Sequence, residues 1–324
     1  MSIPCLARVL FALLLMTAPA ASADFPVTVH HSLGETTIAE RPVRIVSIGL
    51  NDQDFLYALD IAPVGVRAWW GEQPYATWSW SEKQRARLNA RPVVMRGMSV
   101  DPEWVLALHP DLIVATYADI GERLYRQLGE IAPVVVAPAG YAPWSAPWQE
   151  QLRLLDRATS GSEEKAQNII AGFNRKVSAI RTAHPEFKGK TAAFIDIRDG
   201  QFTLWRSSTA TGRFLGDLGF TLPATLEKEA DAAGWIRLGF EHAQRLDLDV
   251  AIWPQGKQET AESIRPYRNL RLYREKRSIW LGPDSLLSAA LWFQSPQSID
   301  FALDEVVPLI STALQEKSGD QTTR

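Results

Sequence analysis

The stretch SEEKAQNIIAGFNRKVSAIRTAHP, residues 162–185, decides the fold of this chain. Its apolar residues recur at spacings of three and four from Ala166 to Ile180, which is the pattern of a single helical stripe. The run Ser160–Glu163 resembles a capping box and predicts the start of the helix, and His184-Pro185 predicts its end. A helix of about 22 residues is roughly 33 Å long. Because it carries one apolar stripe, we expect it to lie on a surface.

On the amino-terminal side of this helix, short apolar runs alternate with helical patterns. The β-branched run Val43–Gly49 ends at a glycine, and Asp52–Leu59 then places its apolar residues on one helical face. Short continuous strands that alternate with helices predict a parallel sheet covered on both faces. The other strand-like runs are Val64–Val66, Leu112–Ala115 and Val134–Val136, and further helical segments start at Asp101 and span Leu124–Ile131.

The alternation restarts on the carboxy-terminal side of the long helix. Strand-like runs lie at Ala192–Ile195, Phe202–Trp205, Val250–Trp253 and Ser278–Leu281, and helical runs lie at Gly212–Leu218 and Ile299–Ile310. The sequence therefore predicts an α/β fold with two lobes joined by one long helix. The expected boundaries are residues 24–160 for the first lobe, 161–187 for the connecting helix, and 188–324 for the second lobe with its carboxy-terminal helix and a frayed tail.

Two segments echo each other, one in each predicted lobe. EWVLALHPDLIVA begins at Glu103 and EHAQRLDLDVAIW begins at Glu241. Each has Leu five residues after the Glu, Asp eight residues after it, and then an apolar strand. The two Asp residues are Asp111 and Asp249. Because both segments occupy the same place in the strand–helix order, they indicate that the two lobes are related.

The composition excludes several classes of protein. The chain has 324 residues, with 34 Lys and Arg against 37 Asp and Glu, so it lacks the basic excess of a nucleic-acid binder. Its single Cys excludes a disulfide framework and any Cys-based metal site. Its five His include no pair at a helical i, i+4 spacing, so we expect no His-built metal site. The unusual number is the twelve Trp.

The first 23 residues are typical of a secretory signal peptide. Arg8 precedes the apolar run Val9–Met16, and the small-residue site Ala21-Ser22-Ala23 predicts cleavage before Asp24. The run has about eight residues, whereas a bilayer span needs about 20. Cys5 lies before the run, so we expect no lipid anchor. We expect an exported, soluble protein; the alternative for this segment is a short buried helix.

Catalytic motifs are missing or incomplete. Gly189-Lys190-Thr191 resembles the end of a phosphate-binding loop, but His184 stands where the motif requires Gly. The chain has no G-x-S-x-G, H-E-x-x-H or G-x-G-x-x-G motif. Two carboxylates could still converge in a Trp-rich sugar hydrolase. An exported glycoside hydrolase therefore stays open as the alternative from another class.

Five aromatic residues gather in the segment WWGEQPYATWSWS, which begins at Trp69. No period of 2 or 3.6 runs through this segment, which is typical of a loop and not of a core element. Open α/β sheets bind ligands at loops that follow strands, so we predict a ligand wall here. The alternative is an aromatic loop that only stabilises the edge of the lobe. The five residues are Trp69, Trp70, Tyr75, Trp78 and Trp80.

Further aromatic residues and arginines follow or flank the predicted strands. Aromatic faces suit flat or apolar ligands, and Arg suits carboxylates and other oxyanions. Together they would bind a bulky, oxygen-rich anion or a metal chelate, with no protein ligand to the metal. These candidates are Arg96, Tyr117, Trp205, Arg206, Trp235, Arg237, Trp292 and Phe293, the last two expected in a loop before the final helix. We expect Trp104, Trp253 and Trp280 in the core instead.

Five segments together resemble the periplasmic binding proteins for iron–siderophores, which feed ATP-driven importers. In family order they are RPVRIVSIG, DPEWVLALHPDLIVAT, YRQLGEIAPVVV, TGRFLGDLGFTLP and WFQSPQSIDFALDEVVP. The resemblance covers nearly the whole mature chain. It implies two Rossmann-like lobes, each a mainly parallel sheet with flanking helices, joined by one long helix that restrains closure. It also implies a monomeric periplasmic protein that is not an enzyme and binds its ligand between the lobes.

The same resemblance implies roles for particular residues. In the family, one Glu on each lobe docks to arginines of the inner-membrane permease, and Glu103 and Glu241 match these positions. Both acids also lie at a helix start, where the helix dipole favours them. Arg96, Tyr117, Trp235 and Trp292 fall on or near pocket positions of the hydroxamate-binding branch.

The resemblance also indicates the ligand, a preformed ferric siderophore, with no cofactor held by the protein. Because candidate Trp and Tyr residues outnumber candidate arginines, a hydroxamate or citrate–hydroxamate siderophore is favoured. A catecholate siderophore, haem or cobalamin in the same transport role stays an alternative. So does a binding domain that serves a sensor in place of a permease.

Overall fold

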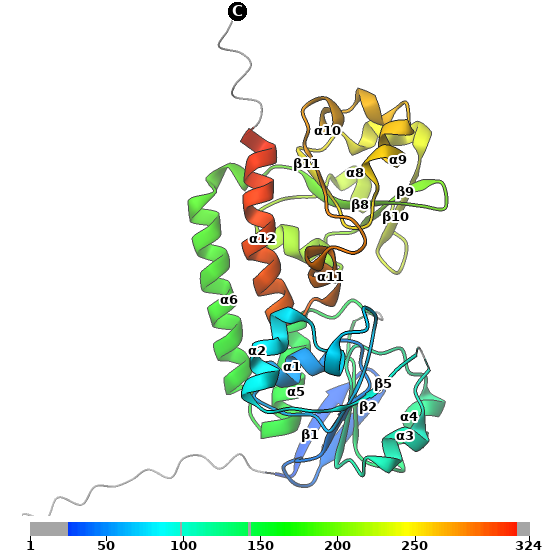
Figure 1. Cartoon of the computed structure of the whole chain (residues 1–324), viewed down its shortest axis with the longest axis vertical. Helices are drawn as coiled ribbons and strands as arrows, with labels where there is room; N and C mark the ends of the chain where they lie inside the picture. The colour runs from blue at the N-terminus through cyan, green and yellow to red at the C-terminus, as the bar shows by residue number, and fades with distance from the viewer. Residues whose placement is uncertain (1–24, 98, 142–143, 316–324) are drawn as a thin grey trace, which may run out of the picture.

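Two five-stranded sheets form two lobes, one below the other in Figure 1. The computed structural model describes residues 25–97, 99–141 and 144–315. The predicted signal peptide lies outside the described residues, and so does the tail predicted after Leu314, except for Gln315, which is helical. Within the described ranges, none of the helices is long and apolar enough to cross a membrane.

The amino-terminal sheet is parallel throughout and has the strand order β5-β4-β3-β6-β7. Its three inner strands are buried at every residue, as expected for a sheet with helices on both faces. The strands are β3 (Ile45–Ser47), β4 (Gly65–Arg67), β5 (Val93–Met95), β6 (Leu112–Ala115) and β7 (Val134–Val136). The helices are α1 (Asp52–Ala58), α2 (Ser79–Arg87), α3 (Pro102–Ala107), α4 (Glu122–Gly129) and α5 (Trp148–Ser160), and a hairpin of β1 (Val27–His31) and β2 (Gly34–Ile38) precedes them.

The carboxy-terminal sheet has the order β10-β9-β8-β11-β12 and mixes strand directions. β8, β11 and β12 run parallel, whereas β9 and β10 add an antiparallel edge. Asp199-Gly200 turns the chain from β8 into β9, and both residues have positive φ, which suits a tight hairpin turn. The strands are β8 (Ala192–Arg198), β9 (Gln201–Trp205), β10 (Trp235–Gly239), β11 (Val250–Trp253) and β12 (Ser278–Trp280). The α-helices of this lobe are α7 (Ala210–Asp217), α8 (Ala224–Glu227), α9 (Gln258–Ser263) and α10 (Arg271–Arg274).

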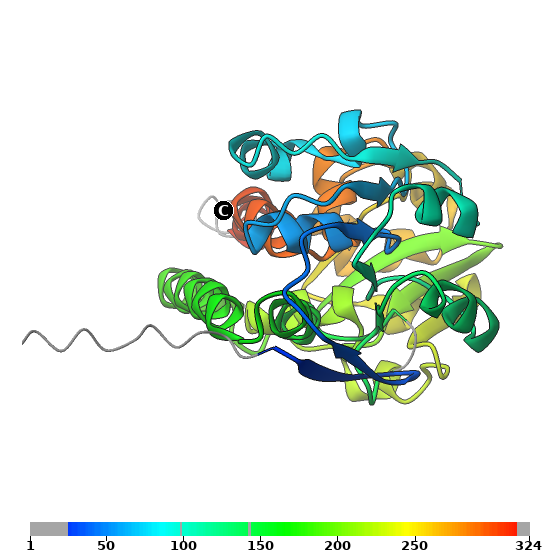
Figure 2. The ribbon, with the colours of Figure 1, turned by 90° about the horizontal axis from the view of Figure 1, so that it is seen from below.

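Helix α6 (Glu164–Ala183) confirms the predicted connecting helix. It ends just before His184-Pro185, as expected. The predicted capping box was wrong, because Ser160 is the last residue of α5 and Gly161 ends that helix in the left-handed conformation. Helix α12 (Pro296–Gln315) runs beside α6 (Figure 1 and Figure 2), and Lys176 of α6 is ion-paired to Asp300 and Asp304 of α12.

The segment expected as a loop before the last helix is a helix, α11 (Leu286–Phe293). The hydroxyl of Ser285 accepts a hydrogen bond from the backbone N–H of Ser288 and caps it. Helix α11 lies between the two lobes (Figure 1), and Gln294, with φ of 51°, separates it from α12. Trp292 and Phe293 therefore occupy its last turn.

The apolar core is continuous between the lobes. One cluster includes Leu152 of α5, Ile170 of α6, Phe194 of β8 and Leu303 of α12. Because this shared core packs both lobes against the long helices, the connection between them is stiff. Trp253 is fully buried with Trp280 stacked on it, and Trp104 packs partly buried against a core cluster of the first lobe, as the sequence predicts.

Candidate functional site

Aromatic side chains follow three strands of the amino-terminal sheet, β4 on one side of the central β3 and β6 and β7 on the other. Trp69 and Trp70 come after β4, Tyr117 comes after β6, and Trp144 comes after β7. The ring centroid of Trp69 lies 4.1 Å from that of Trp70 and 5.6 Å from that of Tyr117. Trp144 meets Tyr117 edge-to-face at 4.8 Å. Since the carboxyl ends of parallel strands share one edge of the sheet, these four rings form one surface, which we call the aromatic wall.

A buried carboxylate positions Tyr117 in the aromatic wall. Asp52, at the start of α1, accepts hydrogen bonds from the backbone N–H groups of Thr116 and Tyr117, at 2.7 and 3.1 Å. Burial raises the pKa of Asp52 to about 6, although these hydrogen bonds act in the opposite direction. Burial also raises the pKa of the Tyr117 phenol to about 12, so its hydroxyl stays protonated at neutral pH.

The loop between β4 and α2 holds its aromatic residues through an unusual backbone. Glu72, Tyr75 and Ala76 all have positive φ, a conformation that costs free energy in residues other than Gly and often accompanies binding sites. Gly71 also has positive φ, and a Cβ there would lie 2.6 Å from the ring of Trp78. Only Gly allows Trp78 to pack this closely.

Part of the aromatic segment is helical, which corrects the prediction of a single loop. Trp80 lies in α2, its ring stacks on Trp78 with centroids 5.1 Å apart, and its Nε1 donates to Asp54 at 2.8 Å. Tyr75 is 37 % exposed and packs under the guanidinium of Arg85. The aromatic segment therefore divides, with Trp69 and Trp70 in the wall and Trp78 and Trp80 behind it.

Phe293 supports the aromatic wall from behind. It is 1 % exposed, and its ring centroid lies 5.2–5.8 Å from those of Trp69, Trp70, Trp78 and Trp80. Its backbone carbonyl accepts a hydrogen bond from Asn51 Nδ2 at 2.5 Å. The sequence predicts Phe293 on the pocket surface, but this burial makes it an anchor that fixes α11 to the first lobe.

The second lobe places an arginine among three tryptophans. The guanidinium carbon of Arg198, at the end of β8, lies 5.5, 5.2 and 5.8 Å from the ring centroids of Trp205, Trp235 and Trp292. Trp205 and Trp235 are register partners on β9 and β10, and Trp292 comes from α11. We call this group the arginine–tryptophan cluster. Trp205 is buried, whereas Trp235 and Trp292 are half-buried.

Arg198 is oriented by a buried acid. Its Nη2 lies 3.2 Å from Asp196 Oδ2 and 3.4 Å from Gln255 Oε1. Burial raises the pKa of Asp196, while the backbone N–H of Gln255 and the Arg198 guanidinium partly offset this rise. The Arg198 side chain is 36 % exposed, so it can still meet an oxyanion.

The three arginines that the sequence predicts for the site have local partners. Arg206 donates to Ser208 Oγ at 2.9 Å. Arg237 pairs with Asp231 at 2.7 Å and lies 5.6 Å from the ring of Trp235, and Arg96 pairs with Glu72 in the aromatic loop. Arg237 therefore borders the arginine–tryptophan cluster, whereas the exposed Arg96 is attached to the loop between β4 and α2.

The two groups of rings meet at α11. Phe293 packs behind the aromatic wall of the first lobe, and its neighbour Trp292 packs against Trp205 of the second lobe at 5.0 Å. The Trp292 Nε1 is buried and finds no hydrogen-bond acceptor within the described parts of the chain. Such a donor favours a ligand with oxygen acceptors, because an unsatisfied buried N–H costs free energy. The arrangement thus combines flat apolar faces, one guanidinium and one indole N–H.

Sequence reasoning missed Arg198 and Trp144 as site residues. The rule that selected Tyr117, a position just after a strand, does not reach Trp144, because β7 ends at Val136. Arg198 precedes the Asp199-Gly200 turn, and that dipeptide was a usable hairpin signal.

A family model described as periplasmic binding protein matches residues 45–265. The chain belongs to this family. The ferric enterobactin-binding periplasmic protein of Escherichia coli is 30 % identical over 75 % of this chain and 79 % of its own length. The Fe(3+) dicitrate-binding periplasmic protein of Escherichia coli is 28 % identical over 68 % of this chain and 69 % of its own.

A solved relative has the same fold as this periplasmic binding protein. The structure of Streptococcus pneumoniae PiaA in complex with ferrichrome superposes with a TM-score of 0.77 at 23 % identity. The match covers 90 % of this chain and 99 % of PiaA. The two-lobe α/β architecture with a long connecting helix, predicted from sequence, is thereby confirmed.

The two acids with a predicted docking role are exposed in this periplasmic binding protein, one on each lobe. Glu103 lies in the first turn of α3, where Asp101 accepts a hydrogen bond from its backbone N–H. Glu241 lies in a 3-10 helix, Phe240–Leu246, which follows β10. Their docking role remains a prediction. Across the described residues, no group of three His, Cys, Asp or Glu side chains is placed to hold a metal ion.

Proposed function

We propose that this periplasmic binding protein captures a ferric siderophore between its lobes and delivers it to an inner-membrane ABC importer. The observation that carries the proposal is the meeting of the aromatic wall and the arginine–tryptophan cluster at α11. A ferric siderophore is a bulky chelate with apolar flanks and outward-facing oxygen atoms. Aromatic faces suit its flanks, and Arg198 and the Trp292 N–H suit its oxygens.

The relatives support an iron chelate as cargo. Two are named for ferric enterobactin and ferric dicitrate, and the PiaA structure contains ferrichrome. In each of these ligands the iron is already chelated before it is bound, although the chelating groups differ. The siderophore supplies all the ligands of the iron, and the protein contacts only the outer surface of the ferric complex.

The balance of rings and cations favours a hydroxamate or citrate–hydroxamate siderophore. Aromatic rings outnumber arginines among the residues that meet at α11. Arg237 and Arg96 are paired with exposed acids outside the arginine–tryptophan cluster, whereas the acid that orients Arg198, Asp196, is buried. A triply charged catecholate complex would require more cationic partners than Arg198 alone supplies. Catecholate siderophores, haem and cobalamin remain the competing ligands for the test.

The proposed delivery step uses Glu103 and Glu241. Two exposed carboxylates, one on each lobe, can pair with arginines on a permease and orient the receptor over it. Export to the periplasm, with cleavage before Asp24, is part of the same proposal. The proposal also includes a monomeric receptor, because a single copy already presents one acid on each of its two lobes.

Quenching of tryptophan fluorescence tests the ligand class. The purified protein is titrated with ferrichrome, ferrioxamine B, ferric aerobactin, ferric enterobactin, haem and cobalamin. We expect saturable quenching by at least one hydroxamate or citrate–hydroxamate complex. Tight binding of haem or cobalamin, with no response to any ferric siderophore, would overturn the proposal.

A further inference from the structure

A groove lies behind the aromatic wall, between the first lobe and the two long helices α6 and α12. It has a volume of about 630 Å³, which is within the range that holds small organic ligands. Its walls come from α1, α2, α5, α6 and α12. Arg198, Trp235 and Trp292 do not line it, so it is separate from the proposed siderophore site.

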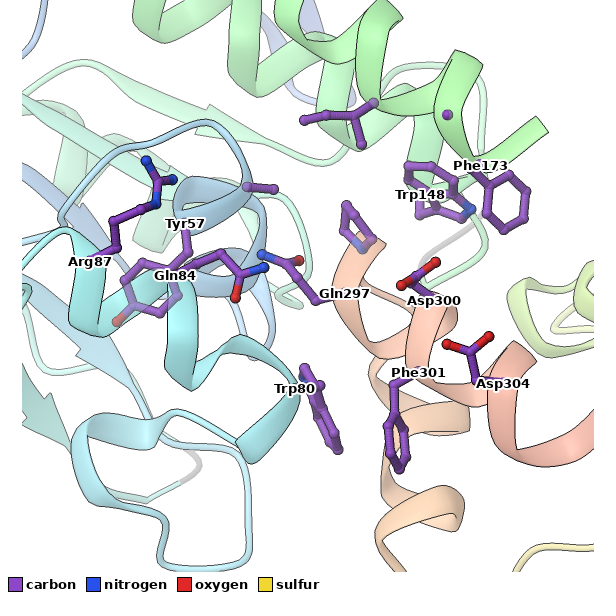
Figure 3. A pocket seen from close by; sticks show the side chains of 14 residues that line it. Tyr57, Trp80, Gln84, Arg87, Trp148, Phe173, Gln297, Asp300, Phe301 and Asp304 are labelled. Atoms are coloured by element: carbon purple, nitrogen blue, oxygen red, sulfur yellow. The ribbon is translucent and has the colours of Figure 1, made fainter. Parts of the chain in front are cut away.

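Five aromatic rings on five different helices line this groove (Figure 3). They are Tyr57 of α1, Trp80 of α2, Trp148 of α5, Phe173 of α6 and Phe301 of α12. Trp148 and Phe173 meet edge-to-face at 5.1 Å, and Trp80 lies 6.2 Å from Phe301. Ring faces held in this way attract an apolar group or an organic cation.

The polar lining consists largely of hydrogen-bond acceptors. Asp300 and Asp304 line the groove beside Phe301, and both contact the single ammonium of Lys176, at 2.7 and 2.8 Å. Two carboxylates that share one cation leave one negative charge in excess. The side-chain oxygens of Gln84 and Gln297 are buried, with no hydrogen-bond donor among the described residues. An N–H group in the groove would satisfy such oxygens.

The one cation in the lining lies on the opposite side of the groove. Arg87 lies across the groove from Asp300 in Figure 3 and is ion-paired to Asp60, which also pairs with Lys165. The negative excess is therefore confined to the side of Asp300 and Asp304, and that side favours a positively charged group.

A glycine keeps the groove open. Gly172 lies in the middle of α6, where Gly is less favourable than Ala for helix stability. A Cβ at this position would have one neighbour within 4 Å, the end of the Arg175 side chain at 3.8 Å. The space beside Gly172 thus belongs to the groove and is not filled by the core. Any larger residue here would occupy it.

We propose that this groove binds an organic ammonium ion that carries an aromatic or similar apolar group. The apolar group packs among Trp80, Trp148 and Phe173, and the ammonium lies beside Asp300 and Asp304. The inference does not rest on the siderophore proposal, because the two sites share no lining residue except Trp80, which lies behind the aromatic wall.

Calorimetry with two matched probes tests the charge preference. Phenethylammonium and 3-phenylpropionate have the same ring and nearly the same length but opposite charge. We expect saturable 1:1 binding of phenethylammonium with a Kd below about 1 mM, and at least tenfold weaker binding of 3-phenylpropionate. Equal affinities, stronger binding of the anion, or no saturation by phenethylammonium at about 10 mM would overturn the proposal.

Two variants place the binding in this groove. Gly172→Leu fills the space without removing any contact, and we expect it to abolish binding; Gly129→Leu, at the open end of α4, is its matched control and should bind as the wild type does. The double variant Asp300→Asn/Asp304→Asn should weaken phenethylammonium binding about tenfold and remove the preference over the anion. Wild-type binding by Gly172→Leu would contradict the proposed location. Affinity for a ferric siderophore should be unchanged in all of these variants, so the two proposals fail separately.

Discussion

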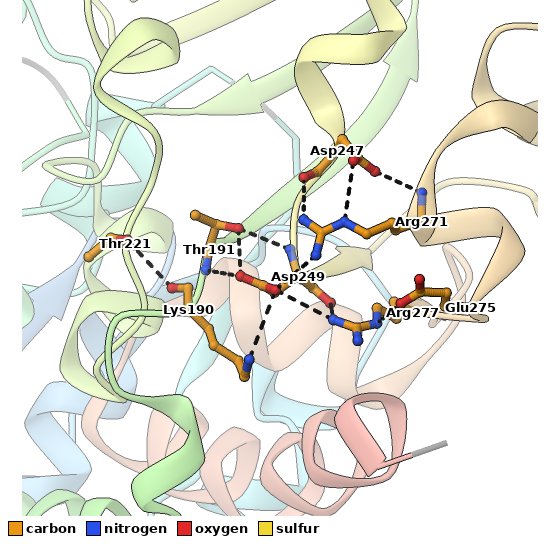
Figure 4. A network of polar contacts seen from close by, with 8 residues as sticks. All are labelled: Lys190, Thr191, Thr221, Asp247, Asp249, Arg271, Glu275 and Arg277. Atoms are coloured by element: carbon orange, nitrogen blue, oxygen red, sulfur yellow. Dashed lines mark hydrogen bonds and ion pairs between the residues drawn. The ribbon is translucent and has the colours of Figure 1, made fainter. Parts of the chain in front are cut away.

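Asp111 and Asp249 make equivalent contacts in the two lobes. The Asp111 carboxylate accepts hydrogen bonds from the backbone N–H groups of Val43 and Arg44, both at 2.8 Å, just before β3. The Asp249 carboxylate accepts from the backbone N–H and hydroxyl of Thr191, at 2.9 and 3.0 Å, just before β8 (Figure 4). The backbone N–H of each Asp donates in return to the carbonyl of Arg44 or Thr191, at 3.0 Å. The sequence echo therefore corresponds to a repeated clamp between two neighbouring strands.

The Asp249 clamp has more neighbouring cations than the Asp111 clamp, so we expect its loss to lower the free energy of unfolding further. Asp249 also faces Lys190, Arg271 and Arg277 (Figure 4), so its removal would leave several cations without their shared acid. We expect Asp249→Asn to lower the free energy of unfolding by about 1–3 kcal/mol, and Asp111→Asn by about 1 kcal/mol. Urea unfolding measures both. A larger loss for Asp111→Asn would show that the cations around Asp249 contribute little.

The carboxyl group of Asp217 should make stability depend on pH. Burial raises its pKa to about 6, partly offset by Arg213 and Arg181. Since the folded pKa exceeds the unfolded one, ionisation costs stability, and this cost grows as pH rises from about 4 to 6. We expect Asp217→Asn to stabilise the protein at pH 7 by on the order of 1 kcal/mol, with a gain that fades toward pH 4. Urea unfolding at four pH values is the measurement, with the exposed Asp284→Asn as control. A gain that is constant with pH would contradict the raised pKa.

Arg198 should determine affinity for an oxygen-rich chelate. Its guanidinium is the cation enclosed by Trp205, Trp235 and Trp292. We expect Arg198→Met to weaken binding of the preferred ferric siderophore by at least about tenfold, and Arg198→Lys to recover part of the loss. Fluorescence titration measures both affinities. Arg206→Met, which removes a neighbouring cation bonded to Ser208, is the matched control. Equal effects of Arg198→Met and Arg206→Met would show only a general charge effect.

The paired acids should affect uptake without affecting ligand binding. We expect the double variant Glu103→Lys/Glu241→Lys to abolish siderophore-dependent growth of an iron-limited host that carries the matching importer, because reversed charges repel arginines on the permease. The affinity of the purified variant for the ferric siderophore should match the wild type. Reversal of the exposed Glu122 and Glu130 on the first lobe is the control. Normal uptake by the Glu103/Glu241 variant would show that the two acids have no docking role and only stabilise the starts of their helices.

The strands of the sheets were largely predictable from the sequence. β6, β7 and β11 coincide with the predicted runs, because parallel strands buried on both faces are short and continuously apolar. Helix α11 was missed for a related reason. Its sequence LLSAALWF is apolar on nearly all sides, since it lies between two lobes, and it has no stripe to reveal a helical period.

The candidate site was predictable in composition but not in arrangement. Position after a strand selected Trp69, Trp70 and Tyr117, whose rings lie together on one surface, and their role in ligand binding stays a prediction. Trp292 and Phe293 are adjacent, and sequence alone could not assign them to different lobes without knowing that they lie on a helix, where neighbours point about 100° apart. The cluster around Arg198 depends on the antiparallel register of β8, β9 and β10, which local patterns do not determine.

The central claim is that the protein recognises a chelate of iron. Calorimetric titration of the purified protein with a ferric hydroxamate or citrate–hydroxamate siderophore, and with the same siderophore without iron, tests it most directly. We expect 1:1 binding of the ferric form with a Kd of about 1 μM or lower, and binding of the iron-free form at least about tenfold weaker, because iron fixes the chelate in one compact shape. Equal affinity for the two forms, or no saturable binding of any ferric siderophore, would contradict the claim.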